Sequence, residues 1–430
     1  MVIRRSRFLS LECTSKSLFY VALLIATASV FSASKVSWAQ ATGPGAIMET
    51  TVALEEAPGA TFPWEGNAAS GAGSLNTGNG NKLTTIPLVG WTGRGGLPVS
   101  LKLYHNSQAE GVSELGERWT HSYDIYLVHN PTTNDVTVQW GDSLSYVFAY
   151  HSGSSGGGGT PPGGGGMIPL SSGGSGGGGS SPYFQPPAGI YDDLTFTTDT
   201  NGGFTTFWLT TKSGLRYTFS NPVGNRWRCA AIADRNGNQI NLTHDIQGYV
   251  TGITDPSNRA LTFAYATVNG AKRLSSVTDP AGRVFSFTYH TAGNGAGSLA
   301  SVVYPAPDGP ASGGNPVISL AYNGDHRITG ITDPRGNTTT FGYNSNGSLS
   351  WEKNPLNQQV SYAYTASYTD ITDARGFTAR HTYSGGRLVS VRDAQNFTES
   401  YGYDSSITGS VAPTARGKPG TTRMTAGGTC

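Results

Sequence analysis

The sequence has little charge, and its charges are balanced. Asp, Glu, Lys and Arg together make up 13% of the 430 residues, well below the ~25% typical of globular domains. The formal net charge is +1, and Lys and Arg do not cluster after the N-terminal segment. Without a basic patch, nucleic acid is not expected as a partner.

Convincing amphipathic helices are also missing beyond roughly the first forty residues. Thr, Tyr, Val and Phe recur instead in short alternating runs, and 60 glycines are available for turns. This pattern predicts an all-β protein. Cysteine is scarce as well: after Cys13, only Cys229 and Cys430 remain, too far apart in the chain for a disulfide framework. We therefore expect the sheet to supply the stability.

Motifs of catalytic and metal sites are absent from the sequence. Its eight histidines occur singly, without a His-x-x-x-His or Cys-x-x-Cys pair for zinc. No Gly-x-Ser-x-Gly element, Ser/His/Asp set or phosphate-binding glycine loop is recognisable. His121 in "WTHSY" is the strongest candidate for a general base, but a structural hydrogen bond within a β motif is the simpler interpretation. We therefore expect no enzyme activity, no catalytic residue, no metal and no cofactor.

The N-terminus has the pattern of an export signal. A basic stretch comes first and contains Arg4, Arg5, Arg7 and Lys16. The apolar run Leu18 to Phe31 follows, and small residues at Ala39 and Ala41 suit cleavage by signal peptidase. The alternatives are an uncleaved anchor and, from "RRSRFL", a twin-arginine signal. We expect a secreted protein, or one at the cell surface or envelope, with no membrane contact after cleavage.

Changes in composition divide the rest of the chain into segments. Residues 42–76 are small and polar and are expected to form a flexible spacer after the signal peptide 1–41. Strand-like runs then predict an N-terminal β domain over 77–228. This domain is interrupted by the Gly/Ser/Pro-rich segment 152–181, which we interpret as an expanded surface loop. A repeat array occupies 229–404, and residues 405–430 are expected to be a disordered tail.

The array repeats one unit about eight times. Each copy carries Asp or Asn at the first turn position: Asp234, Asp255, Asp279, Asp333, Asn354, Asp373 and Asp393. Three residues later most copies have glycine, at Gly237, Gly282, Gly336 and Gly376, and the others have Asn. Most copies end on tyrosine, at Tyr265, Tyr289, Tyr322, Tyr343, Tyr364, Tyr383 and Tyr403. Tyr322 belongs to a distorted copy with a long loop over 304–316.

The repeated residues predict a hairpin. Asp or Asn caps a type I turn with its own side chain, Pro presets φ, and the Gly or Asn accepts a left-handed conformation. The alternating residues that follow predict a strand. Periodic Asp could also indicate calcium, but one Asp per copy at a Pro-containing turn is typical of turn capping. About sixteen strands at ~4.8 Å spacing give a ribbon about 77 Å long, which should curl into an arc or partial wrap.

The unit "LSSVTDPAGRVFSFTY" (274–289) resembles the RHS or YD repeat. The upstream segments "NTGNGNKLTTIPL" (76–88) and "LGERWTHSYDIYL" (115–127) resemble the β-rich domain that often precedes RHS repeats. The resemblance implies a curved, spiralling β-shell on an exported or surface protein. In polymorphic toxins of this family such a shell encloses a C-terminal effector. Residues 402–430 have no core-like segment, so encapsulation and self-cleavage are not carried over to this chain.

The sequence therefore favours an exported scaffold or surface interaction protein without catalysis of its own. One alternative is an adhesin that binds glycans or cell-surface proteins through its loops or exposed aromatic residues. Another is the N-terminal part of a toxin-delivery protein, with an encapsulated effector as a partner only if the chain is a fragment. A truncated product and a short-array member of the family also remain open.

Overall fold

The computed structural model describes residues 75–153, 181–187, 190–306 and 314–401. Several expectations lie outside these residues: the signal peptide 1–41, almost all of the spacer 42–76, most of the insertion 152–181, the tail 405–430, and Tyr403. The described part contains strands, turns and one short 3-10 turn at Arg94–Gly96. No helix in this part is long and apolar enough to cross a membrane. The predicted all-β fold is confirmed.

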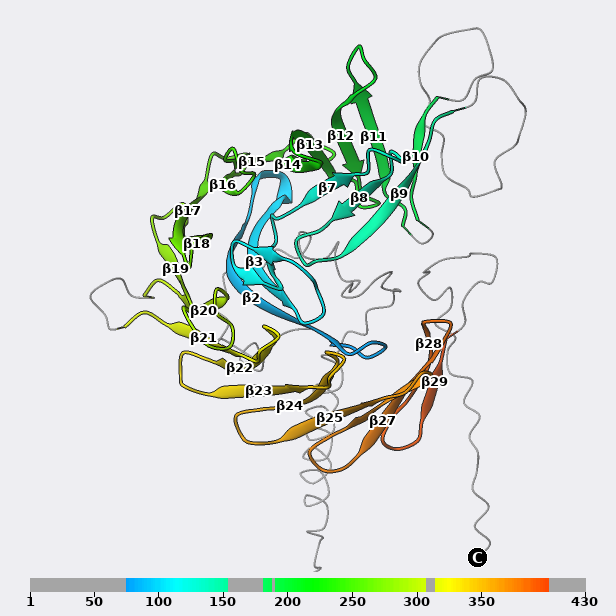
Figure 1. Cartoon of the computed structure of the whole chain (residues 1–430), viewed down its shortest axis with the longest axis vertical. Coiled ribbons are helices and arrows are strands. Elements are labelled where there is room, and N and C mark those ends of the chain that lie inside the picture. Colours follow the sequence, from blue (N-terminus) through cyan, green and yellow to red (C-terminus); the bar gives the residue numbers. More distant parts are fainter. Residues whose placement is uncertain (1–74, 154–180, 188–189, 307–313, 402–430) are drawn as a thin grey trace, which may run out of the picture.

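A small antiparallel sheet comes first, with the strand order β1-β2-β3-β6. Its strands are β1 (Leu75–Asn76), β2 (Asn81–Thr92), β3 (Pro98–Asn106) and β6 (Trp119–His121). A short hairpin of β4 (Val112–Ser113) and β5 (Gly116–Glu117) separates β3 from β6. Figure 1 shows β2 and β3 on the concave side of a much longer curved sheet.

The next strands form a closed circuit within the long sheet. They are β7 (Tyr126–His129), β8 (Val136–Gln139), β9 (Ser145–His151), β10 (Tyr183–Gln185), β11 (Asp193–Thr198), β12 (Phe204–Thr210), β13 (Arg216–Val223) and β14 (Arg226–Ala233). The circuit closes where β14 pairs with β7 and where β10 lies beside β11. Because His151 of β9 pairs with Tyr183 of β10, the insertion 152–181 connects two neighbouring strands.

The repeat array continues from β14 as a ribbon of antiparallel hairpins. Its further strands are β15 (Gln239–His244), β16 (Val250–Thr254), β17 (Ala260–Val268), β18 (Ala271–Thr278), β19 (Val284–Tyr289), β20 (Leu299–Val303), β21 (Val317–Tyr322), β22 (Ile328–Thr332), β23 (Thr338–Tyr343), β24 (Leu349–Lys353), β25 (Gln359–Tyr364), β26 (Tyr368–Thr372), β27 (Thr378–Ser384), β28 (Arg387–Arg392) and β29 (Thr398–Ser400). Each strand pairs with the next one in the chain, and Figure 1 shows the ribbon as an arc.

The boundary expected at residue 229 falls inside β14. The first part of this strand, Arg226 to Arg228, pairs with β7, while Ala231 to Ala233 pair with β15 on the same side. Strands β7 to β13 therefore belong to the same sheet as the repeats. Only residues 75–125 form a separate layer, which we call the strap.

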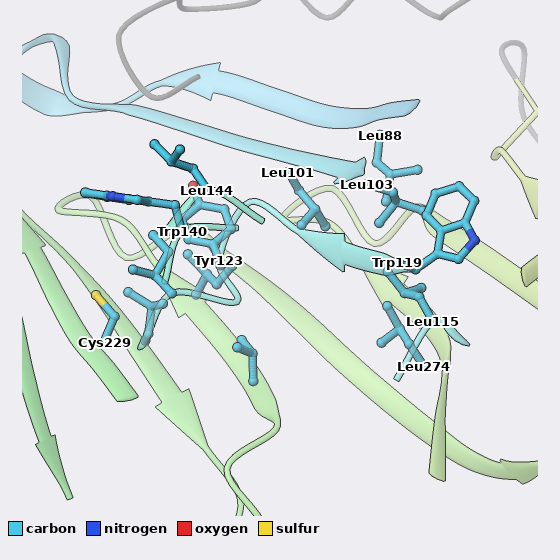
Figure 2. Close-up of a cluster of buried hydrophobic side chains, with 14 of the residues drawn as sticks. Leu88, Leu101, Leu103, Leu115, Trp119, Tyr123, Trp140, Leu144, Cys229 and Leu274 are labelled. Atoms are coloured by element: carbon cyan, nitrogen blue, oxygen red, sulfur yellow. The ribbon is translucent and has the colours of Figure 1, made fainter. Parts of the chain in front are cut away.

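One hydrophobic core joins the strap to the repeats. Leu101 and Leu103 of β3 are 1% and 0% exposed, and they belong to the same buried cluster as Leu274 of the array. Figure 2 shows these side chains gathered with Trp119 of β6 between the two layers. Alternate residues of the repeat strands from β15 to β24 face the strap, so the chain's own N-terminal segment covers this part of the concave face.

Candidate functional site

The candidate site consists of the concave face of the ribbon and the strap that covers it. The repeat turns form the edge of the ribbon. At the Asp333 turn, the Oδ1 atom accepts the backbone N–H groups of Arg335 at 2.9 Å and Asn337 at 2.8 Å. Gly336 has φ +83°, a left-handed conformation. The side chain therefore closes the turn as a cap.

The same pattern is found at the other expected turn residues. Oδ1 accepts two backbone N–H groups at Asp234, Asp255, Asp279, Asn354, Asp373 and Asp393. The residue three places later has positive φ at Gly237, Asn258, Gly282, Asn357, Gly376 and Asn396. Each cap lies in its own copy, and the described residues contain no group of three or more His, Cys, Asp or Glu side chains placed to hold a metal ion.

The repeat tyrosines reach back across their own repeat. Tyr343 donates its hydroxyl proton to the carbonyl of Ile328, fifteen residues earlier, at 2.9 Å. Equivalent bonds run from Tyr265 to Val250, Tyr289 to Leu274, Tyr322 to Leu299, and Tyr364 to Leu349. Burial raises the pKa of Tyr343, so its hydroxyl stays protonated as a donor. Tyr383 differs, because its hydroxyl lies next to Thr77 Oγ1 of the strap.

A β-bulge accompanies the tyrosine in most copies. In β23 the register shifts between Gly342 and Tyr343, so that Tyr343 lies opposite Leu349 of the next strand. A bulge interrupts the ladder and leaves a backbone group without its usual partner. The Leu349 N–H donates instead to Gly80 O of the strap, at 2.8 Å. The bulge thus provides a point where the strap can attach.

The strap uses this attachment point in several copies. Cys229 N–H donates to Ile125 O at 3.1 Å, Leu274 N–H to Glu114 O at 3.0 Å, and Leu299 N–H to Leu115 O at 3.1 Å. These amides, like that of Leu349, occupy one position of the repeat, and each lies next to a register shift. Since a buried amide must find an acceptor, the strap supplies carbonyls at the repeat spacing.

A buried charged cluster fixes the C-terminal end of the strap. His121 Nε2 lies 2.7 Å from Glu114 Oε1, and both side chains are almost fully buried. Tyr123 N–H donates to His121 Nδ1 at 3.1 Å, so the ring proton is placed on Nε2, facing Glu114. Arg228 of β14 pairs with Asp124 at 3.1 Å. His121 Nδ1 accepts a hydrogen bond and the buried Nε2 faces a carboxylate, which favours the structural interpretation over a general base.

A second polar group joins the start of the strap to the later repeats. Lys82 Nζ lies 3.2 Å from Glu352 Oε2, and the Tyr362 hydroxyl donates to Glu352 Oε1 at 2.9 Å. Burial would raise the pKa of the Glu352 carboxyl, but Lys82 and the Tyr362 hydroxyl hold it below its ordinary value. His381 Nδ1 is hydrogen-bonded to Thr77 Oγ1 at 2.8 Å. This end of the strap is therefore held by charge and hydrogen bonds.

Sequence reasoning missed these contacts, although one signal was present. Glu352 occupies the position at which other copies carry Ile253, Val277 or Ile331. A carboxylate in place of an inward aliphatic residue indicates a buried cation nearby. The sequence does not indicate that the cation is Lys82, which is separated from Glu352 by 270 positions.

Two family models match the chain. Residues 322–352 match the RHS repeat, and residues 73–148 match a domain of unknown function, DUF6531. The chain therefore contains an RHS repeat and, on the N-terminal side of it, a DUF6531 domain, as the resemblance in the sequence implied. No curated protein matches the chain. Its repeats form a curved, shell-like β-ribbon.

Several solved structures match part of this chain, and they share little sequence with it. The Tc holotoxin pore of Photorhabdus luminescens matches 71% of this chain, at 11% identity and TM-score 0.31. A TcdB2-TccC3 complex matches 80%, at 10% identity and TM-score 0.26. The N-terminal domain of the effector SpvB from Salmonella typhimurium matches 70%, at 15% identity and TM-score 0.20. The chain spans 16% and 23% of the two Tc chains.

Proposed function

We propose that this protein is an exported RHS-repeat scaffold, or surface interaction protein, without catalytic activity of its own. The observation that carries the proposal is the strap on the concave face. Its carbonyls satisfy repeat amides such as those of Leu274 and Leu349, and its leucines complete the core. A concave face filled by the chain's own residues makes a rigid body whose outer face and turns are available to partners.

The proposed location follows from the leader sequence. A basic stretch, an apolar run and small residues near Ala39 and Ala41 favour export and cleavage. The test is to express the full chain with a C-terminal tag in a bacterium, then to fractionate the cells and determine the N-terminus by mass spectrometry. We expect mature protein outside the cytoplasm that begins near residue 40 or 42. Uncleaved protein confined to the cytoplasm would contradict the proposal.

The toxin-delivery alternative rests on the RHS repeat matched at residues 322–352, because the resemblance to this family includes polymorphic toxins. In such a protein the strap region would be the beginning of a longer shell. The gene sequence after the Cys430 codon distinguishes the cases. Further repeats and a new domain in frame would favour toxin delivery, whereas an immediate stop codon would favour the scaffold.

A further inference from the structure

Three exposed apolar residues follow one another along one edge of the ribbon. Leu356 is 78% exposed, Phe377 51% and Phe397 71%. They lie in the turns that join β24 to β25, β26 to β27 and β28 to β29, in the last part of the arc (Figure 1). Because neighbouring strands are about 4.8 Å apart, successive turns on this edge are about 9.6 Å apart. The three residues, which we call the turn strip, therefore extend over about 19 Å.

The same edge carries small or polar residues in the earlier copies. The third and fifth residues of their turns are Asn236 and Asn238, Ser257 and Arg259, Ala281 and Arg283, and Arg335 and Asn337. The fifth residue donates a hydrogen bond to Oδ2 of the turn aspartate, as Asn337 does to Asp333 at 2.9 Å. Phe377 and Phe397 replace this donor. Each replacement gives up a hydrogen bond and leaves an apolar ring in water, so it costs stability in an isolated chain.

The two ends of the turn strip carry opposite charges. In the part of the chain that the structure describes, Asp393 forms no ion pair, and the hydrogen bonds of its side chain reach only Oδ1. This residue lies at the Phe397 end of the strip. Lys353 lies at the Leu356 end and has no carboxylate partner among the described residues; its Nζ is 5.5 Å from the centre of the Trp351 ring. The strip thus has an acidic end and a basic end.

Such a strip is complementary to a second copy of itself. When two strips run antiparallel, their Phe377 rings meet in the middle, and each Asp393 comes beside Lys353 of the other copy. The Arg375 guanidinium lies 5.1 Å from the Phe377 ring centre, but its charge is paired with Asp373 at 2.9 Å, so it adds little repulsion there. The formal net charge of the chain is only +1, which also favours association.

We propose that two copies of this chain associate through their turn strips about a two-fold axis. In a two-fold contact the same surface of each copy is buried, so both copies regain what the exposed phenyl rings cost them. The partner is therefore a second copy of the chain. This proposal concerns the assembly of the protein, goes beyond the proposed scaffold function and does not depend on it.

The test is sedimentation velocity of the mature full chain over a range of concentrations. Three side chains from each copy make a small contact, so the dimer should be weak, with a Kd of about 100 µM. The average mass should rise towards that of two chains above this concentration, and dilute protein should be monomeric. A protein that is still monomeric at about 500 µM would overturn the proposal.

A double variant removes the rings without harming the turns. Phe377→Asn with Phe397→Asn restores the residue type of Asn238 and Asn337, so both turns should regain their hydrogen bond and the variant should be at least as stable in thermal unfolding. Its association should be at least tenfold weaker. Ile246→Asn is the matched control, because Ile246 is 94% exposed but lies in a turn at the opposite edge; it should leave association unchanged. Normal association of the double variant, or an equal loss in the control, would overturn the proposal.

The antiparallel arrangement has its own test. Lys353→Glu places a carboxylate beside Asp393 of the other copy and should weaken association about five- to tenfold. Adding Asp393→Asn removes this repulsion and keeps the turn cap, as Asn354 does in its own turn, so most of the affinity should return. If this second change recovers nothing, the strips do not meet in the proposed way. Failure of these tests would leave the export and scaffold proposals untouched.

Discussion

The earlier and later copies of the array share their turns and tyrosines but differ on the concave face. In the earlier copies the inward residues are almost all apolar: Ile232, Ile240, Leu242, Ile253, Leu261, Phe263, Val277, Phe285, Phe287, Val302, Ile318, Leu320, Ile331, Thr339 and Phe341. In the later copies they are more mixed: Glu352, Val360, Tyr362, Ile371, Ala379, His381, Val391 and Glu399.

This difference corresponds to the residues that the strap places against each part of the array. Its middle presents Leu101, Leu103 and Trp119 to the earlier copies, whereas its beginning presents Thr77 and Lys82 to the later ones. The comparison shows that turns and tyrosines specify the ribbon, and that the inward residues specify what covers it. A repeat can therefore exchange its apolar residues for charged ones without losing its hairpin, provided that the covering segment supplies a counter-charge.

The largest loss of stability is expected where the strap packs on the earlier, apolar copies. Trp119 is 1% exposed, and its indole N–H donates to the Tyr322 hydroxyl at 3.0 Å. Trp119→Ala should lower the free energy of unfolding by about 3–5 kcal/mol, because it leaves a cavity between the strap and the repeats. Chemical denaturation of the purified protein measures this change. A loss under about 1 kcal/mol would show that the strap packs only loosely.

The next largest loss of stability is expected where the strap contacts the later, more polar copies. Lys82→Met leaves the partly buried Glu352 carboxylate, whose side chain is 29% exposed, without its cation, which should cost about 1–3 kcal/mol. The double variant Lys82→Met, Glu352→Leu should recover most of this loss, since an apolar pair can replace a buried ion pair. The same denaturation experiment compares all three proteins. If the double variant were as unstable as the single one, the later copies would not be able to use apolar cover.

A histidine of the strap, His105, should also make the stability of the protein depend on pH. Burial lowers the pKa of His105 to about 3, and its Nε2 is hydrogen-bonded to His326 O at 2.9 Å. Below its unfolded pKa of 6.5, the unfolded state binds a proton that the folded state does not, so stability falls as the pH falls from 6.5 towards 3. His105 should contribute about 1.4 kcal/mol per pH unit within this window.

The measurement must separate His105 from the other histidines. Against the effect of burial, the Glu114 carboxylate raises the pKa of His121, whose contribution has the opposite sign and lies above pH 6.5. The groups near His105 are Arg118, Arg327 and the backbone of His326. His105→Gln should make the slope of the stability profile between pH 6.5 and 5 shallower by about 1.4 kcal/mol per pH unit, while His244 and His381, whose pKa values burial lowers to about 4, keep the rest of the slope. An unchanged slope would mean that His105 is accessible to protons in the folded protein.

A smaller effect is expected from the tyrosine hydroxyls. Tyr343→Phe removes the hydrogen bond to Ile328 O and should lower the free energy of unfolding by about 1 kcal/mol. The smallest effect is expected at the far end: Phe397 is 71% exposed, so Phe397→Ser should change stability by less than about 0.5 kcal/mol. Thermal unfolding of both variants tests this order. If Phe397→Ser were the more harmful, the last copy would be covered in solution.

The sequence predicts local structure well and long-range contacts poorly. The Asp333 cap, the positive φ at Gly336 and the alternating strands depend on residues close together in the chain, and each has its own side-chain signature. The contacts of the strap, in contrast, join residues that are far apart in the chain. Leu349 and Gly80 are joined through backbone atoms, which leave no side-chain pattern to recognise. The same is true of the pairing between Trp227 and Leu127 that ties β14 to β7.

The strap supplies carbonyls to one amide position of the repeats. Residue-resolved hydrogen exchange of the full chain tests it directly at Cys229, Leu274, Leu299 and Leu349. We expect these amides to exchange as slowly as the amides inside the neighbouring strands. Exchange as fast as that of solvent-exposed turn amides would contradict it, since the strap would then not be bound to the concave face.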